Sequence, residues 1–295
     1  MLVPAATRQN RLLGAITTAE YDRLALDLEL VHMPAGFVIY DTDIAQRYAY
    51  FPVDALISIQ CVMRNGCVGE TAIVGNEGMV GVSIFMGGQS TPGRAVVKCA
   101  GVGYRVKASV IRGEFDRAGS LMRLMLRYTQ ALLTQVSQTA VCNRHHSINE
   151  QLCRGLLLSL DLIQVYEFAM THELIAKFLG VRREGITECA GRLQKAGLIR
   201  YHRGMFSVID REGLLQCSCE CYAVIHAEYR RLLPRLPLNA LIARAKERKS
   251  APSWLLSSEL LEKHSRMAVG GEPQGDSKAQ LRPSEGVDTP SCLGP

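Results

Sequence analysis

The chain has 295 residues, of which 47% are hydrophobic, so it is long and apolar enough for two domains with buried cores. Its 34 Lys and Arg residues exceed its 28 Asp and Glu residues, and this net charge of +6 favours a polyanionic partner without identifying one. No apolar run approaches the roughly 18 residues that a membrane helix needs, and residues 1–15 lack the apolar region of a signal peptide. We therefore expect a cytoplasmic protein without a membrane domain, and its ten scattered cysteines to be mostly reduced thiols.

Residues 12–118 have the pattern of a β-rich domain. A capping box at Thr17 and Glu20 predicts a short helix to about Leu30. Short strand-forming stretches follow, separated by Gly-rich turns, and Asn65-Gly66 is a strong hairpin signal. We expect strands at residues 37–40, 48–51, 55–63, 67–74, 94–99 and 103–108. This arrangement favours a sandwich or barrel.

Residues 119–143 predict a long helix with two adjacent apolar stripes. The first stripe contains Leu121, Met125, Tyr128, Leu132, Gln135, Thr139 and Cys142. The second contains Met122, Leu126, Thr129, Leu133, Val136 and Ala140. One stripe can pack on the β-rich domain while the other pairs with a second copy of the chain. The alternative is a single broad stripe buried inside a monomer, and we favour the homodimer.

A hinge is expected at residues 143–147, after which a capping box at Ser147 and Glu150 opens a helix through Leu162. The adjacent His145 and His146 cannot share one face of a helix. We therefore expect them to be hinge or surface residues, and not a pair of metal ligands.

Residues 171–211 carry the motif around which the chain is organised. Thr171 can cap a helix that ends at Gly180, and a second helix runs from about Arg182 to Ala196. Strands at 198–201 and 205–209 then flank the turn His202-Arg203-Gly204. Two helices joined by a tight turn and followed by a hairpin predict a winged helix-turn-helix.

The charge of this segment favours DNA as its partner. From residue 182 to residue 205 there are six Lys or Arg residues and two Glu residues. Arg182, Arg183 and Glu184 open the second helix, where a recognition helix meets base edges, and Arg203 lies where a wing would meet phosphate. The alternative is a small helical domain with a solvated basic face.

The run ELIAKFLGVRREGITECAGRLQKAGLI resembles the DNA-binding domain of the Crp/Fnr transcription regulators. Ala176, Gly180, Arg183 and Glu184 match the family pattern. The resemblance implies base contacts from Arg183 and Glu184 and a phosphate contact from Thr171. Glu188 stands where a family member that binds cyclic AMP has a base-reading Arg, so we expect a different target sequence. The predicted DNA-binding residues are Thr171, Arg182, Arg183, Glu184, Thr187, Glu188 and Arg203.

The same resemblance covers about residues 12–234 and implies a β-roll of the cyclic-nucleotide-binding type. Gly81 matches the nucleotide-binding pattern, but Val82 falls where the ribose-binding Glu should be. Arg94 aligns with the Arg that pairs with phosphate, and it can equally be a structural residue at a strand end. Without this Glu as an acceptor, the ribose hydroxyl of a bound cyclic nucleotide would be buried and unpaired, at a cost of about 1–3 kcal/mol. We therefore expect an effector other than cyclic AMP, with Gly81 and Arg94 as candidate contacts, and no cofactor.

Cys217, Cys219 and Cys221 form a dense group that could bind zinc or respond to oxidants. On one continuous helix, positions 217 and 221 share a face while 219 points away. We therefore expect buried or spectator thiols and no metal. No Cys precedes Cys61, which excludes the N-terminal iron–sulfur ligands of the oxygen-sensing family members.

These observations predict an α+β protein with a double-stranded β-roll (12–118), a dimerisation helix (119–143), a winged helix-turn-helix domain (144–234) and a largely disordered tail (235–295) with a basic run at 244–249. We expect a DNA-binding transcription regulator and not an enzyme. Its expected partners are double-stranded DNA, a second copy of the chain and RNA polymerase. The alternatives are a thiol- or metal-dependent redox sensor and a sensor module that does not bind DNA. The sequence does not choose between activation and repression.

Overall fold

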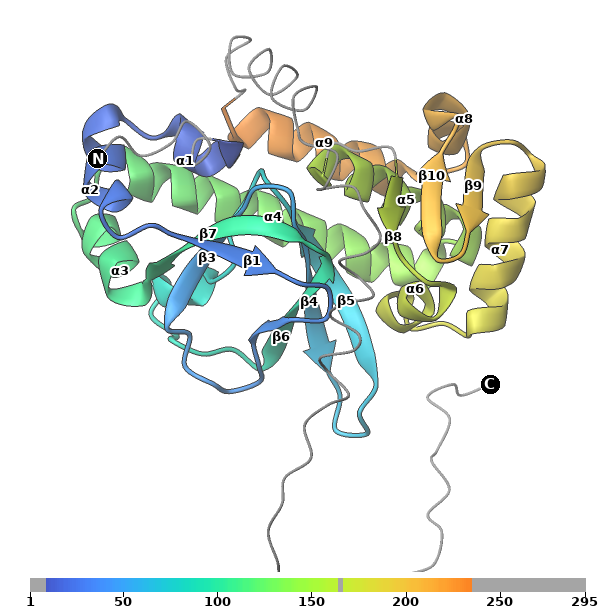
Figure 1. The fold of residues 1–295 in the computed structure, drawn as a ribbon, viewed down its shortest axis with the longest axis horizontal. Coiled ribbons are helices and arrows are strands. Elements are labelled where there is room, and N and C mark those ends of the chain that lie inside the picture. The colour runs from blue at the N-terminus through green and yellow to red at the C-terminus, as the bar shows by residue number, and fades with distance from the viewer. Residues whose placement is uncertain (1–8, 164–166, 235–295) are drawn as a thin grey trace, which may run out of the picture. The chain divides into compact units, whose positions relative to one another are not determined.

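The computed structural model describes residues 9–163 and 167–234. It has the predicted α+β architecture, in which antiparallel sheets come first and a mainly helical region follows the long helix α4 (Ser120–His145; Figure 1). No helix in the described ranges is long and apolar enough to cross a membrane. The disordered tail and basic run that we expected over residues 235–295 lie outside the described residues.

Two antiparallel sheets build the β-roll. The first has the order β1 (Glu29–Met33), β7 (Gly101–Lys107), β3 (Tyr48–Pro52). The second has the order β2 (Val38–Tyr40), β6 (Gly93–Cys99), β4 (Leu56–Val62), β5 (Val68–Val74). Gly66 takes a φ of +82° in the tight turn between β4 and β5, as Asn65-Gly66 predicted. Apolar side chains of both sheets, including Phe51, Leu56 and Val106, meet in one core.

Helices α1 (Arg11–Ala15), α2 (Thr18–Ala25) and α3 (Ala108–Asp116) accompany the sheets. The helix predicted to reach Leu30 is shorter than expected, because α2 ends at Ala25 and β1 begins at Glu29. Leu26 is 88% exposed, so the apolar residue that extended the helical pattern is not part of a buried face.

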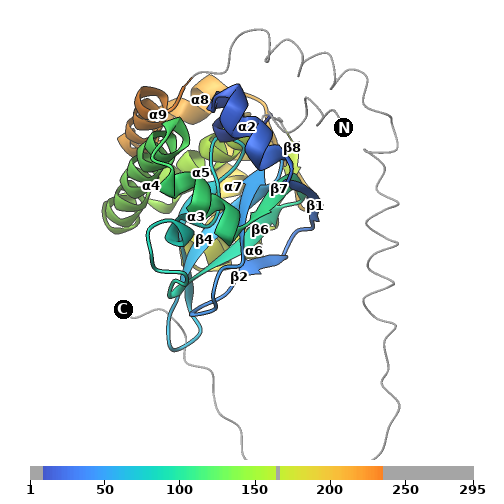
Figure 2. The same cartoon turned by 90° about the vertical axis from the view of Figure 1, so that its left-hand side faces the viewer.

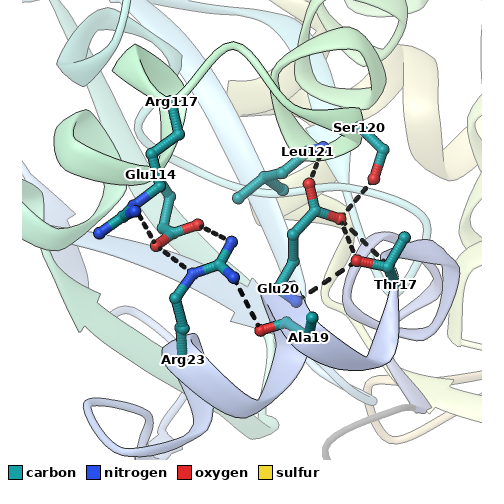
Figure 3. Close-up of polar contacts among 8 residues, drawn as sticks. All are labelled: Thr17, Ala19, Glu20, Arg23, Glu114, Arg117, Ser120 and Leu121. Carbon is teal, nitrogen blue, oxygen red and sulfur yellow. Dashed lines mark hydrogen bonds and ion pairs between the residues drawn. The ribbon is translucent and has the colours of Figure 1, made fainter.

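Glu20 joins α2 to the start of α4 (Figure 3). The predicted capping box is present, since Thr17 caps α2 and the Glu20 carboxylate accepts a hydrogen bond from the Thr17 amide. The same carboxylate accepts from the Ser120 hydroxyl and, at 2.9 Å, from the Leu121 amide. Burial opposes ionisation, but these hydrogen bonds outweigh it and lower the pKa of Glu20 to about 2. An ionised carboxylate therefore anchors the first turn of α4.

Arg23 makes a second connection beside it, from α2 to α3 (Figure 3). Its Nε and Nη2 donate to the two oxygens of Glu114 at 2.8 and 2.7 Å, and Arg117 approaches the same carboxylate at 3.0 Å. The Arg23 guanidinium lowers the pKa of Glu114. The bidentate geometry fixes the orientation of both helices more firmly than a single contact would.

Helix α4 buries its first predicted stripe within the chain. Tyr128 is fully buried and donates to the Met79 carbonyl of the β-roll at 2.9 Å. Helix α9 (Glu220–Leu232) runs along α4 in both views (Figures 1 and 2). Tyr229 of α9 packs edge-to-face on Tyr128, with the ring centroids 6.5 Å apart. The helix continues through Asn143, which we had placed in a hinge, and ends only at His145.

Helix α5 (Ile148–Ile163) begins at the predicted capping box, with the Ser147 amide and hydroxyl bonded to Glu150 at 2.8 and 2.7 Å. The C-terminal helices correct one expectation. On one continuous helix Cys219 would point away from Cys217 and Cys221, but α8 (Arg211–Gln216) ends before these residues and Cys219 is the N-cap of α9. This break brings Cys219 next to Cys221, which a continuous helix would not do.

Candidate nucleic-acid interface

A helix, a tight turn and a second helix form the candidate interface. Thr171 caps α6 (His172–Leu179), because its Oγ1 accepts from the Leu174 amide at 3.2 Å. Gly180 ends α6 with a φ of +66°, a conformation that favours glycine. The chain then enters α7 (Arg183–Lys195), whose N-cap is Arg182. The apolar faces of the pair are buried through Ile175, Ala176, Phe178, Ile186, Cys189, Ala190 and Leu193.

A three-stranded sheet forms the wing. Strand β10 (Met205–Val208) pairs with β9 (Ile199–His202) on one side and with β8 (Glu167–Ala169), which the sequence did not predict, on the other. Arg203 and Gly204 connect β9 to β10 with φ angles of +47° and +82°, as a two-residue type I′ turn requires. The arginine at the tip is therefore held in a strained, tightly defined conformation.

The wing tip lies beside the N-terminus of α6. The Met170 amide donates to the Gly204 carbonyl at 2.7 Å, and a Cβ on Gly204 would lie 3.7 Å from Thr171 Cγ2. The predicted phosphate-binding residues Thr171 and Arg203 thus come from distant parts of the chain to one edge. A helix N-terminus and a nearby arginine both favour an anion.

The remaining predicted contacts lie along the exposed side of α7. Arg182, Arg183, Glu184, Thr187 and Glu188 are all exposed. No ion pair among the described residues engages Arg182, Arg183 or Glu184. The first turn of α7 therefore presents two cations and one anion to solvent, ready to pair with polar groups of another molecule.

Two predicted residues have partners within the chain. Thr187 Oγ1 donates to the Arg183 carbonyl at 3.1 Å and lies 3.1 Å from His172 Nδ1, so it also helps to hold α7 on α6. Glu188 pairs with Arg192 at 2.5 Å, one turn further along α7. The acid at this position is therefore partly neutralised by its own helix.

His172 is a structural residue of the interface that the sequence pattern did not reveal. Its ring stacks on Tyr201 of the wing with centroids 4.0 Å apart, and it also approaches Phe206. Burial, with the charge of Arg183, lowers the pKa of His172. The neutral ring joins the start of α6 to the wing. His172 and Tyr201 are about 30 positions apart, so no local sequence pattern could have predicted this contact.

The two candidate effector contacts both have structural roles in the β-roll. Gly81 takes a φ of +117°, and a Cβ there would lie 2.9 Å from Ile84 Cδ1, so glycine is needed for the backbone alone. Arg94 pairs bidentately with Asp41, through Nε and Nη2 at 2.8 Å each. Neither arrangement requires a ligand, and their part in effector binding stays a prediction.

Comparisons with known proteins agree with this geometry. Residues 150–217 match the model of the Crp-like helix-turn-helix domain. A Crp/Fnr family transcriptional regulator from Eubacterium rectale has a similar structure, with a TM-score of 0.56 and 17% identity over 71% of this chain and 98% of that one. FixK2 from Bradyrhizobium japonicum is similar with a TM-score of 0.55 and 16% identity over 65% and 98%. The c-di-GMP responsive regulator CLP from Xanthomonas campestris has a TM-score of 0.54 and 11% identity over 65% and 99%. No curated protein matches the sequence.

The fold and the matched domain show the architecture that this chain shares with known proteins. Its described residues combine a cyclic-nucleotide-binding-like β-roll, a long helix and a Crp-like helix-turn-helix, which is the architecture of the Crp/Fnr transcription regulators. The resemblance noted in the sequence is confirmed for the helix-turn-helix domain, which is Crp-like over residues 150–217, and for the fold, which is that of the Crp/Fnr regulators.

Proposed function

We propose that the chain binds a two-fold DNA site as a homodimer and regulates transcription in response to a signal at the β-roll other than cyclic AMP. In this proposal it acts in the cytoplasm without catalysing a reaction, and it contacts RNA polymerase at its promoters. The observation that carries the proposal is the solvent-exposed first turn of α7, with Arg182, Arg183 and Glu184 unpaired by any described ion pair. Arg can bond bidentately to guanine and Glu can accept from cytosine.

The exposed stripe of α4 supports the homodimer. Leu126 and Leu133 are 48% and 60% exposed and stand seven positions apart, while the first stripe is covered by the chain itself. Apolar residues repeated at this spacing pair helices in coiled coils. A second copy would bring an identical stripe and, by its two-fold symmetry, a second recognition helix for the other half-site.

The proposed switch is a shift between two arrangements of the dimer. A signal that binds one arrangement more tightly raises its population and so changes the spacing of the two recognition helices. Half-sites one helical turn apart, about 34 Å, are the expected match for the active arrangement. The absence of a ribose-binding Glu at Val82 and the pairing of Arg94 with Asp41 support an effector other than cyclic AMP.

The test begins with DNA selected by the full-length protein from a random-sequence pool, with and without a low-molecular-weight cell extract that can supply an effector. Fluorescence anisotropy then measures binding of the selected site and of unrelated DNA across a salt series. We expect Arg183→Ala to weaken binding of the selected site by about 5- to 150-fold, the equivalent of about 1–3 kcal/mol for one bidentate contact. Binding to unrelated DNA should change much less.

A matched control is Arg112→Ala, which removes an exposed arginine from α3 of the β-roll. It should leave both affinities unchanged. Selection of no sequence even with extract, or equal losses for the two arginine variants, would reject specific recognition by α7.

A further inference from the structure

Three thiols and one imidazole gather where α4 ends and α9 begins. Cys142 lies in the last turn of α4, and His146 immediately follows that helix. Cys219 is the N-cap of α9 and Cys221 lies in its first turn. Their four ligand atoms, three Sγ and one ring nitrogen, all lie within 4.8 Å of one another. The four residues come from two segments far apart in the sequence.

The spacing of these atoms fits one tetrahedral metal ion. With Zn–S bonds of about 2.3 Å and Zn–N bonds of about 2.0 Å, tetrahedral angles place two sulfurs about 3.8 Å apart and a sulfur and a nitrogen about 3.5 Å apart. Cys142 Sγ lies 3.5 Å from Cys219 Sγ, and Cys221 Sγ lies 3.6 Å from His146 Nδ1. The donors thus already stand close to the positions that a zinc ion would impose.

The imidazole is oriented as in metal sites. His146 turns Nδ1 towards the thiols and Nε2 towards the Glu220 carboxylate, which lies 3.3 Å away. A ligating histidine commonly donates its second ring N–H to a carboxylate, which fixes the tautomer that binds the metal. The Gln151 side chain also donates to the His146 carbonyl at 2.9 Å and so holds the backbone of this ligand.

The charge balance supplies an independent argument. Arg154 is only 5% exposed, and no ion pair found in the described ranges includes it. Its Nη1 donates to Thr139, one turn before Cys142 on the same face of α4, and its Nε has no described partner. A buried cation without a counter-charge is costly. Three thiolates around Zn²⁺ carry a net charge of −1 and would provide it.

We propose that Cys142, His146, Cys219 and Cys221 bind a structural zinc ion that fastens the end of α4 to the start of α9. The three thiols are 0%, 5% and 1% exposed, and with four protein ligands no position is left for water or substrate. The donors are too close together to surround an iron–sulfur cluster, which holds sulfide ions as well as iron between its ligands. Soft thiolates with one imidazole favour zinc over magnesium or calcium. From the sequence alone, we expected no metal at these cysteines.

The test is metal analysis of the full-length protein, purified under reducing conditions without chelators. We expect about one zinc per chain by mass spectrometry, and cobalt replacement should give the intense visible bands of four-coordinate thiolate sites. Cys219→Ser and His146→Ala should lose the bound metal. Their matched controls, exposed Cys61→Ser and the neighbouring exposed His145→Ala, should retain it.

Glu220→Gln gives a variant that keeps all four ligands and changes only an exposed side chain. It should fold normally and bind zinc about 10- to 100-fold more weakly, as measured by competition with a chromogenic chelator. The proposal is overturned if the wild-type protein contains no zinc and, after anaerobic reduction, takes up none from added zinc chloride. It is equally overturned if zinc content is the same in Cys219→Ser and Cys61→Ser, or if the reduced protein reverts to a disulfide among these thiols while zinc is present.

Discussion

Glu77 should make the stability of the protein depend on pH. Its side chain is 2% exposed, Oε1 accepts one hydrogen bond from the Gly75 amide at 3.3 Å, and Oε2 has no partner in the described part of the chain. Burial raises the pKa of Glu77 from 4.5 to about 7. Because the folded state holds this proton more tightly than the unfolded state, the contribution of Glu77 to stability falls as the pH rises from 4.5 through 7.

The size of the effect follows from the pKa. One pKa unit corresponds to about 1.4 kcal/mol, so the ionised carboxylate should destabilise the folded state by about 3 kcal/mol at alkaline pH. Glu77→Gln keeps the shape of the side chain and removes the ionisation. Near pH 8 we expect Glu77→Gln to unfold at a higher urea concentration than the wild type. Near pH 5 the difference between the two free energies of unfolding should be smaller by about 2 kcal/mol.

Urea titrations followed by circular dichroism at the two pH values measure this difference. Glu167→Gln, at an exposed carboxyl of β8, is the control and should follow the wild type at both. If the wild type and Glu77→Gln lose stability in parallel between about pH 5 and about pH 8, the carboxyl is not the titrating group and the argument from burial is wrong.

Two further predictions concern the first turn of α4 and its exposed side. Glu20→Gln should lower the free energy of unfolding by about 1–3 kcal/mol at neutral pH, because the hydrogen bonds from Ser120 and Leu121 are strongest to the ionised carboxylate. Since the pKa of Glu20 is lowered from 4.5 to about 2, this difference should diminish as the pH falls between these values in urea titrations, and a pH-independent loss would contradict it. Leu133→Glu should turn a dimer into a monomer in analytical ultracentrifugation without changing the helix content, whereas an unchanged mass would place the dimer contact elsewhere.

The winged helix-turn-helix was predictable because its signals are local. Thr171 and Gly180 mark the two ends of α6 within ten positions, and the turn at Arg203 and Gly204 is set by its own residues. The capping boxes at Thr17 and Ser147 were recognisable for the same reason, since a cap depends on residues three positions apart. Each of these elements is specified by hydrogen bonds within a few residues.

The sequence could not reveal features that depend on distant partners. Strand β1 has a weak alternation, and its pairing with β7 joins Glu29 to Arg105, far along the chain. Likewise, Cys142 stands 77 positions before Cys219, so their sulfurs meet only through the packing of α9 on α4. The local pattern at 217–221 was misleading because it hid the break between α8 and α9. A cluster built from two helix ends has no fixed spacing that a motif could capture.

The zinc proposal has a mechanical consequence for the switch. Helix α9 already contacts the middle of α4, where Tyr229 packs on Tyr128, and the thiol cluster would join the two helices again at Cys142 and Cys219. Two attachments along one pair of helices prevent them from rotating against each other. A signal that displaces α4 would then carry α9 with it, and the break between α4 and α5 at His146 would be restrained by the metal. In the proposed homodimer, the change that separates the active arrangement from the inactive one would then lie at the stripe containing Leu126 and Leu133, between the two subunits.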